Sequence, residues 1–423
     1  MQIRKVVICG GTRIPFVKSF TKYNDSNNKE MMTFVLKDLV NKFNLQGKII
    51  GEVALGAVMK HADDWNMARE CVLGSGLNPQ TPAYDLQRAC GTSLSAVIQL
   101  SNKIALGQID VAIAAGTDSN SDAPLELSKG LSKKLMAVSQ ARTLVDKISV
   151  VPQLRPKDFV PKAPTAGEPR TGKSMGQHCE MMAKEWGVTR EEQDTLTYES
   201  HHKAAAAYEE GFYNDLVTPF KGQEKDGILR PDTSMEALAK LRPAFDRSEK
   251  GTLTAGNSTS LTDGAAAVLL ASEDYAKANG LPILAYFKDA EVAAVDFLGG
   301  EGLLMAPAYA VPRLLQRNNM KLQDFTFYEI HEAFAAQVLC TLKAWESDDF
   351  CKNKLGLDGA LGSIDRSKMN VKGGSVAIGH PFAATGARIT AGLAKILDQA
   401  GSGTGLISVC TAGGMGVTAI LEK

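Results

Sequence analysis

Two patterns of hydrophobic and polar positions take turns along much of the chain. Short apolar runs such as "KVVICGG" and "IDVAIAAGTDS" predict strands, and segments with apolar residues three or four positions apart, such as "MMTFVLKDLVNKF", predict helices. Because strands and helices follow one another repeatedly, the sequence predicts an α/β fold in which helices cover a sheet.

The middle of the chain, residues 121–251, has a different pattern. It contains a basic stretch, a proline-rich stretch and the long helical segment "TREEQDTLTYESHHKAAAAYEEGF". We interpret it as an inserted loop domain. It separates an N-terminal half, residues 1–120 completed by 252–279, from a C-terminal half, residues 280–423. Within it, 129–170 could serve as a docking or membrane-surface element, although a solvated loop is the simpler interpretation.

An internal repeat relates the two halves. Gly91 precedes a predicted helix that leads to a buried strand at Val111, and Gly386 precedes a helix that leads at the same spacing to Leu406. Both units then end in a turn of small residues. We therefore predict a duplicated α/β unit whose turns carry the reactive residues.

Composition narrows the class of protein. The 423 residues include 47 basic and 47 acidic side chains, so the chain has no net charge that would attract nucleic acid. Its seven cysteines form no CxxC pair, which indicates a reducing compartment without a disulfide framework. The sequence shows neither a secretory start nor an apolar run long enough for a transmembrane segment. We expect a cytoplasmic protein.

Four short stretches carry residues suited to catalysis. They are Cys90 in "RACGTS", His331 in "YEIHEAF", His380 in "GHPFAATG" and Cys410 in "SVCTAGGMG". Cys90 precedes a predicted helix, whose dipole favours a thiolate. A thiol, imidazole bases and glycines that expose backbone N–H groups suit acyl transfer through a thioester, with an enolate formed beside it.

The remaining cysteines and histidines have structural interpretations. Most other cysteines are expected to be small buried hydrophobic side chains, and Cys179, in the insertion, is left open. This expectation covers Cys9, Cys71, Cys340 and Cys351. The other histidines, His61, His178, His201 and His202, are expected in loops or facing solvent. No two histidines have the spacing of a helical zinc site, so no metal is expected.

Taken together and in this order, the four stretches resemble the thiolase family over essentially the whole chain. The family pattern is a cysteine followed by small residues, then [N/H]EAF, GHPxxxTG and CxxGGxG. The segments "MGQHCEMMAK", "AKLRPAFDR" and "TLTAGNSTSLTDGAAAVLL" are also similar to thiolase segments. The resemblance implies two similar α/β halves stacked in five layers, αβαβα, with an inserted loop domain.

The resemblance also implies an activity, the CoA-dependent cleavage of a 3-oxoacyl-CoA to acetyl-CoA and a shortened acyl-CoA. Cys90 would carry the acyl group, His380 would deprotonate Cys90, and Cys410 would protonate the enolate. One oxyanion hole would use His380 and a water held by His331. The other would use the backbone N–H groups of Cys90 and Ala412.

Coenzyme A would be a substrate, and neither a metal nor a redox cofactor is implied. Family matching places Arg230 near the adenine, where a guanidinium can stack on a base and meet phosphate. It places Thr259 near the pantetheine arm, and Ser174 and Met175 along the channel. The resemblance further implies a homodimer or a dimer of dimers.

Two positions depart from the commonest thiolase pattern. His331 stands where most thiolases have asparagine. The histidine resembles the degradative HEAF-containing group, which includes the β-subunit of the trifunctional fatty-acid β-oxidation complex. That group suggests a hydratase/dehydrogenase partner subunit. Ala412 stands where many relatives have glycine, and alanine is acceptable there if its φ is negative.

Three alternatives stay open at this point. The first is a biosynthetic acetyl-CoA acetyltransferase that makes acetoacetyl-CoA. The second, from another class, is a non-catalytic acyl-CoA-binding or structural subunit, which would be expected to lack at least one of the four reactive residues. The third is a β-ketoacyl synthase, which would combine a cysteine with two histidines and would not need Cys410.

Overall fold

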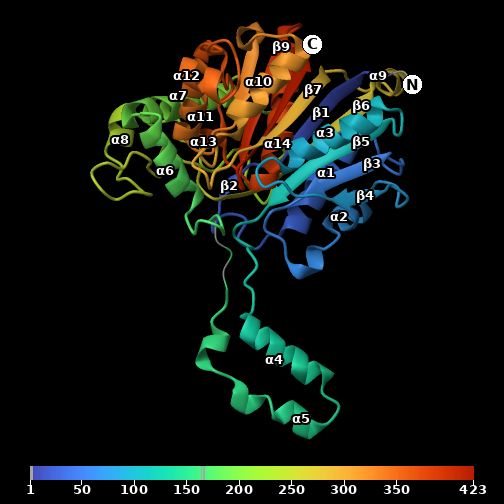
Figure 1. Ribbon diagram of the computed structural model, residues 1–423. Helices are drawn as coiled ribbons and strands as arrows, with labels where there is room; N and C mark the ends of the chain where they lie inside the picture. Colours follow the sequence, from blue (N-terminus) through green and yellow to red (C-terminus); the bar gives the residue numbers. More distant parts are fainter. Residues whose placement is uncertain (1–2, 163, 165–166) are drawn as a thin grey trace.

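A ten-stranded sheet runs through the computed structural model, which describes residues 3–162, 164 and 167–423 (Figure 1). The strand order is β4-β3-β5-β6-β1-β7-β10-β9-β8, and the short β2 pairs with β6. The strands are β1 (Val6–Arg13), β2 (Val17–Lys18), β3 (Glu52–Gly56), β4 (Ala83–Asp85), β5 (Val111–Asp118), β6 (Thr262–Ser272), β7 (Ala285–Ala294), β8 (Phe327–Ile330), β9 (Thr404–Thr411) and β10 (Met415–Glu422).

The two halves of this sheet repeat one pattern of strand pairing. In the first half β1 and β6 are antiparallel, as are β6 and β5, while β5 and β3 are parallel. In the second half β7 and β10 are antiparallel, as are β10 and β9, while β9 and β8 are parallel. Helix α3 (Thr92–Ala105) leads into β5 as α14 (Thr385–Ala400) leads into β9. The predicted duplication is confirmed, and the antiparallel β1–β7 pair joins its two copies.

Three hydrophobic clusters divide the molecule into five layers. Helices α1 (Asn28–Lys42) and α2 (Met67–Ser75) pack on one face of the first half-sheet. Helices α3 and α14 lie between the two half-sheets and share a core with both. Helices α10 (Ala306–Asn318) and α11 (Ala335–Glu346) cover the outer face of the second half-sheet. This αβαβα stack agrees with the predicted fold.

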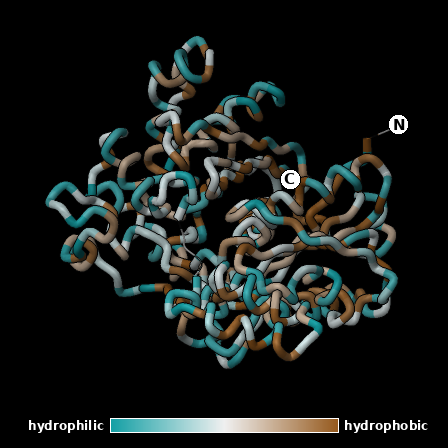
Figure 2. The backbone as a smooth tube through the Cα atoms, turned by 60° about the horizontal axis from the view of Figure 1, so that its bottom comes forward, coloured by the Kyte–Doolittle hydropathy of each residue, from teal (hydrophilic) through white to brown (hydrophobic). Residues whose placement is uncertain are grey.

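Strand alternation distributes side chains between these layers. In β5, Ile113 enters the outer core while Ala112 and Ala114 enter the central one. Successive side chains of a strand point to opposite faces, and here both faces are covered by helices, so the strand is apolar throughout. Figure 2 shows the resulting hydrophobic colour along strands of the body and hydrophilic colour on many peripheral segments.

The chain between β5 and β6 falls into two parts. One is a projecting arm, residues 123–162, which carries α4 (Lys129–Gln140) and α5 (Leu144–Ile148) away from the body (Figure 1). The arm closes on itself through the backbone pairing of Glu126 with Lys162. Its helices have almost no core, because α4 buries only Leu131 and α5 buries no residue.

The second part packs against the C-terminal half. It contains α6 (Met175–Glu185), α7 (Arg190–Glu209) and α8 (Met235–Ala239). Helices α6 and α7 contact α11, and α7 also contacts α13 (Ser375–Ile378). The remaining helices are α9 (Glu273–Ala278) and α12 (Asp348–Asn353). Within the described residues, no helix combines the length and the hydrophobicity that a membrane crossing requires.

The crossing of α3 and α14 provides a test of the central layer. A Cβ atom on Gly386 would lie 2.3 Å from the backbone nitrogen of Leu94, so Gly386→Ala must push the helices apart. We expect it to lower the free energy of unfolding by about 1–3 kcal/mol. Gly392→Ala, in the same helix, has no atom within 4 Å of the new Cβ and should stabilise by up to about 1 kcal/mol. Thermal unfolding midpoints check this pair, and equal midpoints would contradict it.

Candidate active site

The backbone on both sides of Cys90 is shaped to bring its thiol to the end of β9. Ala89 has a φ of 43°, a conformation rare outside glycine, and Gly91 is the N-cap of α3. A Cβ atom on Gly91 would lie 2.7 Å from Val417 Cγ2 and 2.9 Å from Thr411 Cγ2. Only glycine allows this approach, and the predicted position of Cys90 just before a helix is confirmed.

His331 and Cys410 are placed by neighbouring parallel strands. His331 directly follows β8, and its backbone N–H donates to Ser408 O in β9 at 2.8 Å. Cys410 is near the end of β9. Since the carboxyl ends of parallel strands lie at the same edge, both residues face one site, as is common for ligand sites in α/β sheets. Both are about 1% exposed.

His380 lies in the loop between α13 and α14. Gly379, with a φ of 115°, provides the turn before it. The backbone N–H of His380 donates to Thr262 Oγ1 at 2.8 Å, and His380 also forms a β-bridge with Leu261. Thr262 begins β6, so this loop of the C-terminal half is fastened to the N-terminal half.

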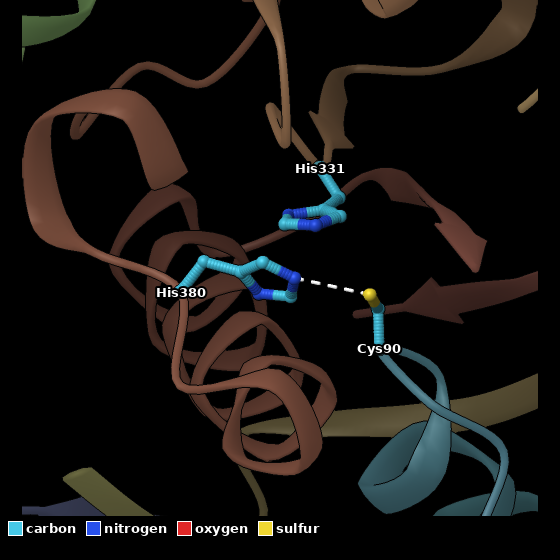
Figure 3. A group of neighbouring side chains, drawn as sticks. All are labelled: Cys90, His331 and His380. Atoms are coloured by element: carbon cyan, nitrogen blue, oxygen red, sulfur yellow. Dashed lines mark hydrogen bonds between the residues drawn. The ribbon is translucent and has the colours of Figure 1, made fainter. Parts of the chain in front are cut away.

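Figure 3 shows that three of the predicted residues converge. His380 Nε2 lies 3.0 Å from Cys90 Sγ, and the rings of His331 and His380 are 4.2 Å apart between centroids. His380 Nδ1 lies 2.5 Å from Thr385 Oγ1 at the start of α14. Cys410 lies close enough to Cys90 for the two sulfurs to interact, since burial and then Cys90 raise the pKa of Cys410 well above the ordinary value.

Burial sets the protonation of the Cys90–His380 pair. It raises the pKa of Cys90 to about 12, although backbone N–H groups act in the opposite direction. Burial, and then the charge of Arg388, lower the pKa of His380 to about 3. Both groups are therefore neutral near pH 7. The expectation that the helix terminus holds Cys90 as a thiolate is wrong, because desolvation outweighs the dipole.

A neutral pair can transfer a proton in one of its two tautomers. With the ring proton on Nδ1, where Thr385 Oγ1 can accept it, His380 Nε2 is the acceptor of the Cys90 thiol proton. Nε2 is consequently the atom that can receive a proton when the sulfur attacks. This is the arrangement needed for a cysteine nucleophile activated by a histidine base.

The backbone near Cys90 provides two donors at the sulfur. The N–H groups of Ala412 and of Cys90 itself favour negative charge on the sulfur and lower the pKa of the thiol against the effect of burial. The φ of Ala412 is not positive, which is the condition for an alanine at this position. Gly413 and Gly414, which follow it, do have positive φ. The Gly413 N–H donates to Glu168 Oε1 at 2.6 Å, which holds this loop from the other side.

Of the residues predicted to bind CoA, only Arg230 lines the neighbouring groove. The groove has a volume of about 430 Å³ and is also lined by Ser258, Ser260 and Val376. Thr259 lies within this same segment, and its side chain donates to Ala333 O, two residues after His331.

Ser174 and Met175 are not lining residues of this groove. The Ser174 hydroxyl accepts the Gln177 N–H as the N-cap of α6, and Met175 packs on the core of the C-terminal half. Both side chains are therefore engaged in holding the start of α6.

Two histidines are more buried than expected. His178, in α6, is 6% exposed and lies 2.7 Å from Thr171 Oγ1. His201, in α7, is also 6% exposed, and its Nδ1 accepts the Arg230 N–H. Their helices pack on the body, and their hydrogen bonds satisfy the rings there. Cys179 is also fully buried, like Cys9, Cys71, Cys340 and Cys351.

Several polar residues of the site were missed by the sequence analysis. Ser375 Oγ lies 2.7 Å from His331 Nδ1 and accepts from Arg388 Nη2 at 2.6 Å. The carboxylate of Glu332, next to His331, accepts hydrogen bonds from Ser200 and Asn370. Ser375 and Arg388 flank the "GHP" motif, so proximity in sequence could have indicated them. Glu332 forms part of the quoted motif, whereas Glu168 lies in the insertion, where no pattern marks it.

Cys90, His331 and His380 are also the described residues whose donor atoms could share one ion, since these atoms lie within 4.8 Å of one another. The absence of a metal from the reaction stays a prediction.

Comparison with known proteins identifies the class. The thiolase N-terminal domain matches residues 6–274, and the thiolase C-terminal domain matches residues 281–423. The chain belongs to the thiolase family and is an acyltransferase. It is 42% identical over 424 residues to a 3-ketoacyl-CoA thiolase of Yersinia pestis (strain Pestoides F), covering 99% of this chain and 97% of that protein.

Solved structures agree with this assignment. A Bacillus anthracis acetyl-CoA acetyltransferase superposes with a TM-score of 0.82 at 30% identity, over 100% of this chain and 99% of the other. Human mitochondrial 3-ketoacyl-CoA thiolase gives a TM-score of 0.81 at 27% identity, over 99% of each chain. The fold is the thiolase fold.

The neutral pair predicts an unusual pH dependence. His380 gains a proton only as the pH falls toward 3, and Cys90 loses one only as the pH rises toward 12. The rate of acylation of Cys90 should therefore be nearly constant between about pH 5 and pH 9, where ordinary histidine and cysteine would titrate. Single-turnover acylation rates measured across this range check it. A bell-shaped profile with apparent pKa values near 6.5 and 8.5 would contradict it.

Glu168 offers a second test. Glu168→Ala removes the acceptor of the Gly413 N–H in a part-buried hydrogen bond, which costs about 1.5 kcal/mol and loosens the loop that carries Ala412. We expect kcat to fall about tenfold, by the same free energy, with a smaller change in KM. Glu168→Gln keeps an oxygen at this position and should retain most of the activity. Steady-state kinetics of both variants check this, and a Glu168→Ala enzyme with the kcat of the wild type would refute a role for the contact.

Proposed function

We infer that the protein is a 3-ketoacyl-CoA thiolase, which uses coenzyme A to cleave a 3-oxoacyl-CoA into acetyl-CoA and a shortened acyl-CoA. The observation that carries this inference is the neutral Cys90 thiol 3.0 Å from His380 Nε2, beside Cys410. A nucleophile with its base and a second proton donor is what the two chemical steps require. The 42% identity to 3-ketoacyl-CoA thiolases supports the choice of reaction.

In the first half-reaction Cys90 gives its proton to His380 Nε2, and the sulfur attacks the 3-keto carbon of the substrate. The bond between C2 and C3 breaks, and its electron pair goes to C2 as the enolate of acetyl-CoA. The Cys410 thiol protonates C2. The products of this step are acetyl-CoA and an acyl group in thioester linkage to Cys90.

In the second half-reaction the thiol of a new coenzyme A attacks the acyl-enzyme. Its proton returns to Cys410, the acyl group moves to the CoA sulfur, and Cys90 leaves and recovers its proton from His380. The catalytic residues thus end in the states in which they began, which gives a ping-pong mechanism.

Two sets of donors suit the negative oxygens of these steps. The N–H groups of Cys90 and Ala412, which favour negative charge at the sulfur, would stabilise the oxygen of the attacked carbonyl. His380 and His331 would stabilise the thioester oxygen of the enolate. Each such donor contributes roughly 100- to 1,000-fold in rate in known cases.

The groove lined by Arg230 is the site that we propose for coenzyme A. It extends from Arg230 to Val376, next to the residue that contacts His331, so a bound CoA could reach the thiol from the surface. A thiolase of Ascaris suum with a TM-score of 0.81 and 26% identity, over 99% of this chain and 100% of the other, was solved in complex with coenzyme A. We propose no metal or redox cofactor.

The finer assignment rests on His331. A histidine in the HEAF stretch supports placement in the degradative group, and hence a role in cytoplasmic fatty-acid β-oxidation. We propose a homodimer or a dimer of dimers, which the half-buried edge strand β4 supports. We also propose a hydratase/dehydrogenase partner subunit. The projecting arm supports this, since it exposes large apolar side chains that include Leu125, Leu127, Leu144, Val145 and Val160.

The biosynthetic alternative is favoured by one observation, the 30% identity to an acetyl-CoA acetyltransferase of the same fold. The identity to the 3-ketoacyl-CoA thiolases is higher, at 42%. The alternative of a non-catalytic binding or structural subunit is favoured by no residue, because all four reactive side chains are present.

The test is the mass of the intact protein after brief mixing with 3-oxoacyl-CoA substrates from short to long chain, without free CoA. Wild type should gain the acyl group, Cys90→Ala should gain none, and added CoA should release the group. Acylation restricted to the shortest substrate would favour the biosynthetic enzyme. If CoA binds while no substrate acylates the wild type, the catalytic proposal fails.

A further inference from the structure

The two nitrogens of His331 have different surroundings. Nδ1 lies 2.7 Å from Ser375 Oγ, whereas Nε2 is buried and has no hydrogen-bond partner among the described residues. Burial, and then the neighbouring His380 and Arg388, lower the pKa of His331 well below its ordinary value. The ring is therefore neutral, and its single proton is on one nitrogen or the other.

The contacts of Ser375 decide between the two tautomers. Its Oγ receives an N–H from Arg388 Nη2 at 2.6 Å, and a guanidinium can only donate. The hydroxyl proton of Ser375 therefore needs an acceptor elsewhere, and among the described residues the atom in contact that can accept it is His331 Nδ1. If Nδ1 carried the ring proton, the fully buried hydroxyl would donate to nothing. Nδ1 is thus the acceptor, and the proton of His331 is on Nε2.

We propose that Ser375 and Arg388 are positioning residues that fix His331 as the Nε2–H tautomer, so that His331 is a hydrogen-bond donor in the site. The unpartnered Nε2–H would donate to the thioester oxygen of the substrate, or to a water bound to that oxygen. This last step rests on the proposed thiolase reaction, whereas the tautomer does not.

The proposal gives the two adjacent histidines opposite roles. To act as the base for Cys90 in the proposed reaction, His380 presents a lone pair at Nε2 and holds its own proton on Nδ1, next to Thr385 Oγ1. His331 has its proton on Nε2 and presents a donor. One ring can therefore take the thiol proton while the other stabilises negative charge, although their centroids are only 4.2 Å apart. Ser375 with Arg388 determines the form of His331, and the base role toward Cys90 requires the opposite form of His380.

Nuclear magnetic resonance on protein labelled with ¹⁵N-histidine tests the tautomer without any reaction. The nitrogen shifts of His331, assigned by comparison with His331→Asn, should show a protonated Nε2 and a bare Nδ1 throughout the neutral range. Ser375→Ala should give a mixture of tautomers, and Ser375→Thr, which keeps the hydroxyl, should restore the wild-type form. A wild-type His331 protonated on Nδ1 would overturn the proposal.

Kinetics test whether Ser375 acts through His331. Ser375→Ala should slow acylation of Cys90 about tenfold to a hundredfold, the range found when the partner that orients a functional histidine is removed. KM should change little. In the His331→Asn background the same substitution should have no further effect. Ser363→Ala, which removes an exposed hydroxyl, is the matched control and should behave as wild type.

The outcomes separate the two proposals. An unchanged acylation rate in Ser375→Ala, or an equal loss in both backgrounds, would overturn the positioning role while leaving the thiolase reaction intact. If neither the wild type nor any variant is acylated, the proposed thiolase reaction is wrong. The nitrogen shifts still decide the tautomer of His331 in that case. Circular dichroism and unfolding midpoints show whether Ser375→Ala is folded, and Ser375→Thr repeats the test in a form that keeps the hydroxyl.

Discussion

The contact between the Cys90 thiol and His380 Nε2 is the constraint on which the rest of the structure depends. The two residues come from different halves of the chain, and a hydrogen bond of 3.0 Å leaves little tolerance in how those halves are arranged. Helices α3 and α14 set the arrangement where they cross closely at Gly386, and Gly91 lets the thiol meet the end of β9. Packing in the central layer is therefore also the geometry of the active site.

Burial around this contact determines its chemistry. Exclusion of water keeps both Cys90 and His380 neutral. The thiol proton therefore moves to the histidine only when a substrate is bound, since the backbone donors can then stabilise the negative oxygen that forms. The same desolvation makes each hydrogen bond more selective, because an unpaired donor is costly there. For this reason a serine hydroxyl can decide which nitrogen of a neighbouring ring carries a proton.

Much of the fold could be predicted from the sequence because it rests on local patterns. The alternation of strands and helices, the duplicated unit and the place of Cys90 before a helix are all encoded over short segments. The protonation of Cys90 could not be, since it depends on how deeply the packed halves bury a sulfur. Glu168 meets Gly413, and Arg230 meets His201, only through folding of the insertion. Contacts of this kind leave no periodic trace in the sequence.

The antiparallel pairing of β1 with β7 has an evolutionary consequence. It joins two copies of one strand pattern edge to edge, as two separate half-length chains would join in a symmetric dimer. In such a dimer both copies would be identical, and each active-site loop would have to serve every role at once. Once the copies were fused, one loop could evolve into the nucleophile and the other into the base. Asymmetry of sequence within symmetry of fold is what the fusion made available.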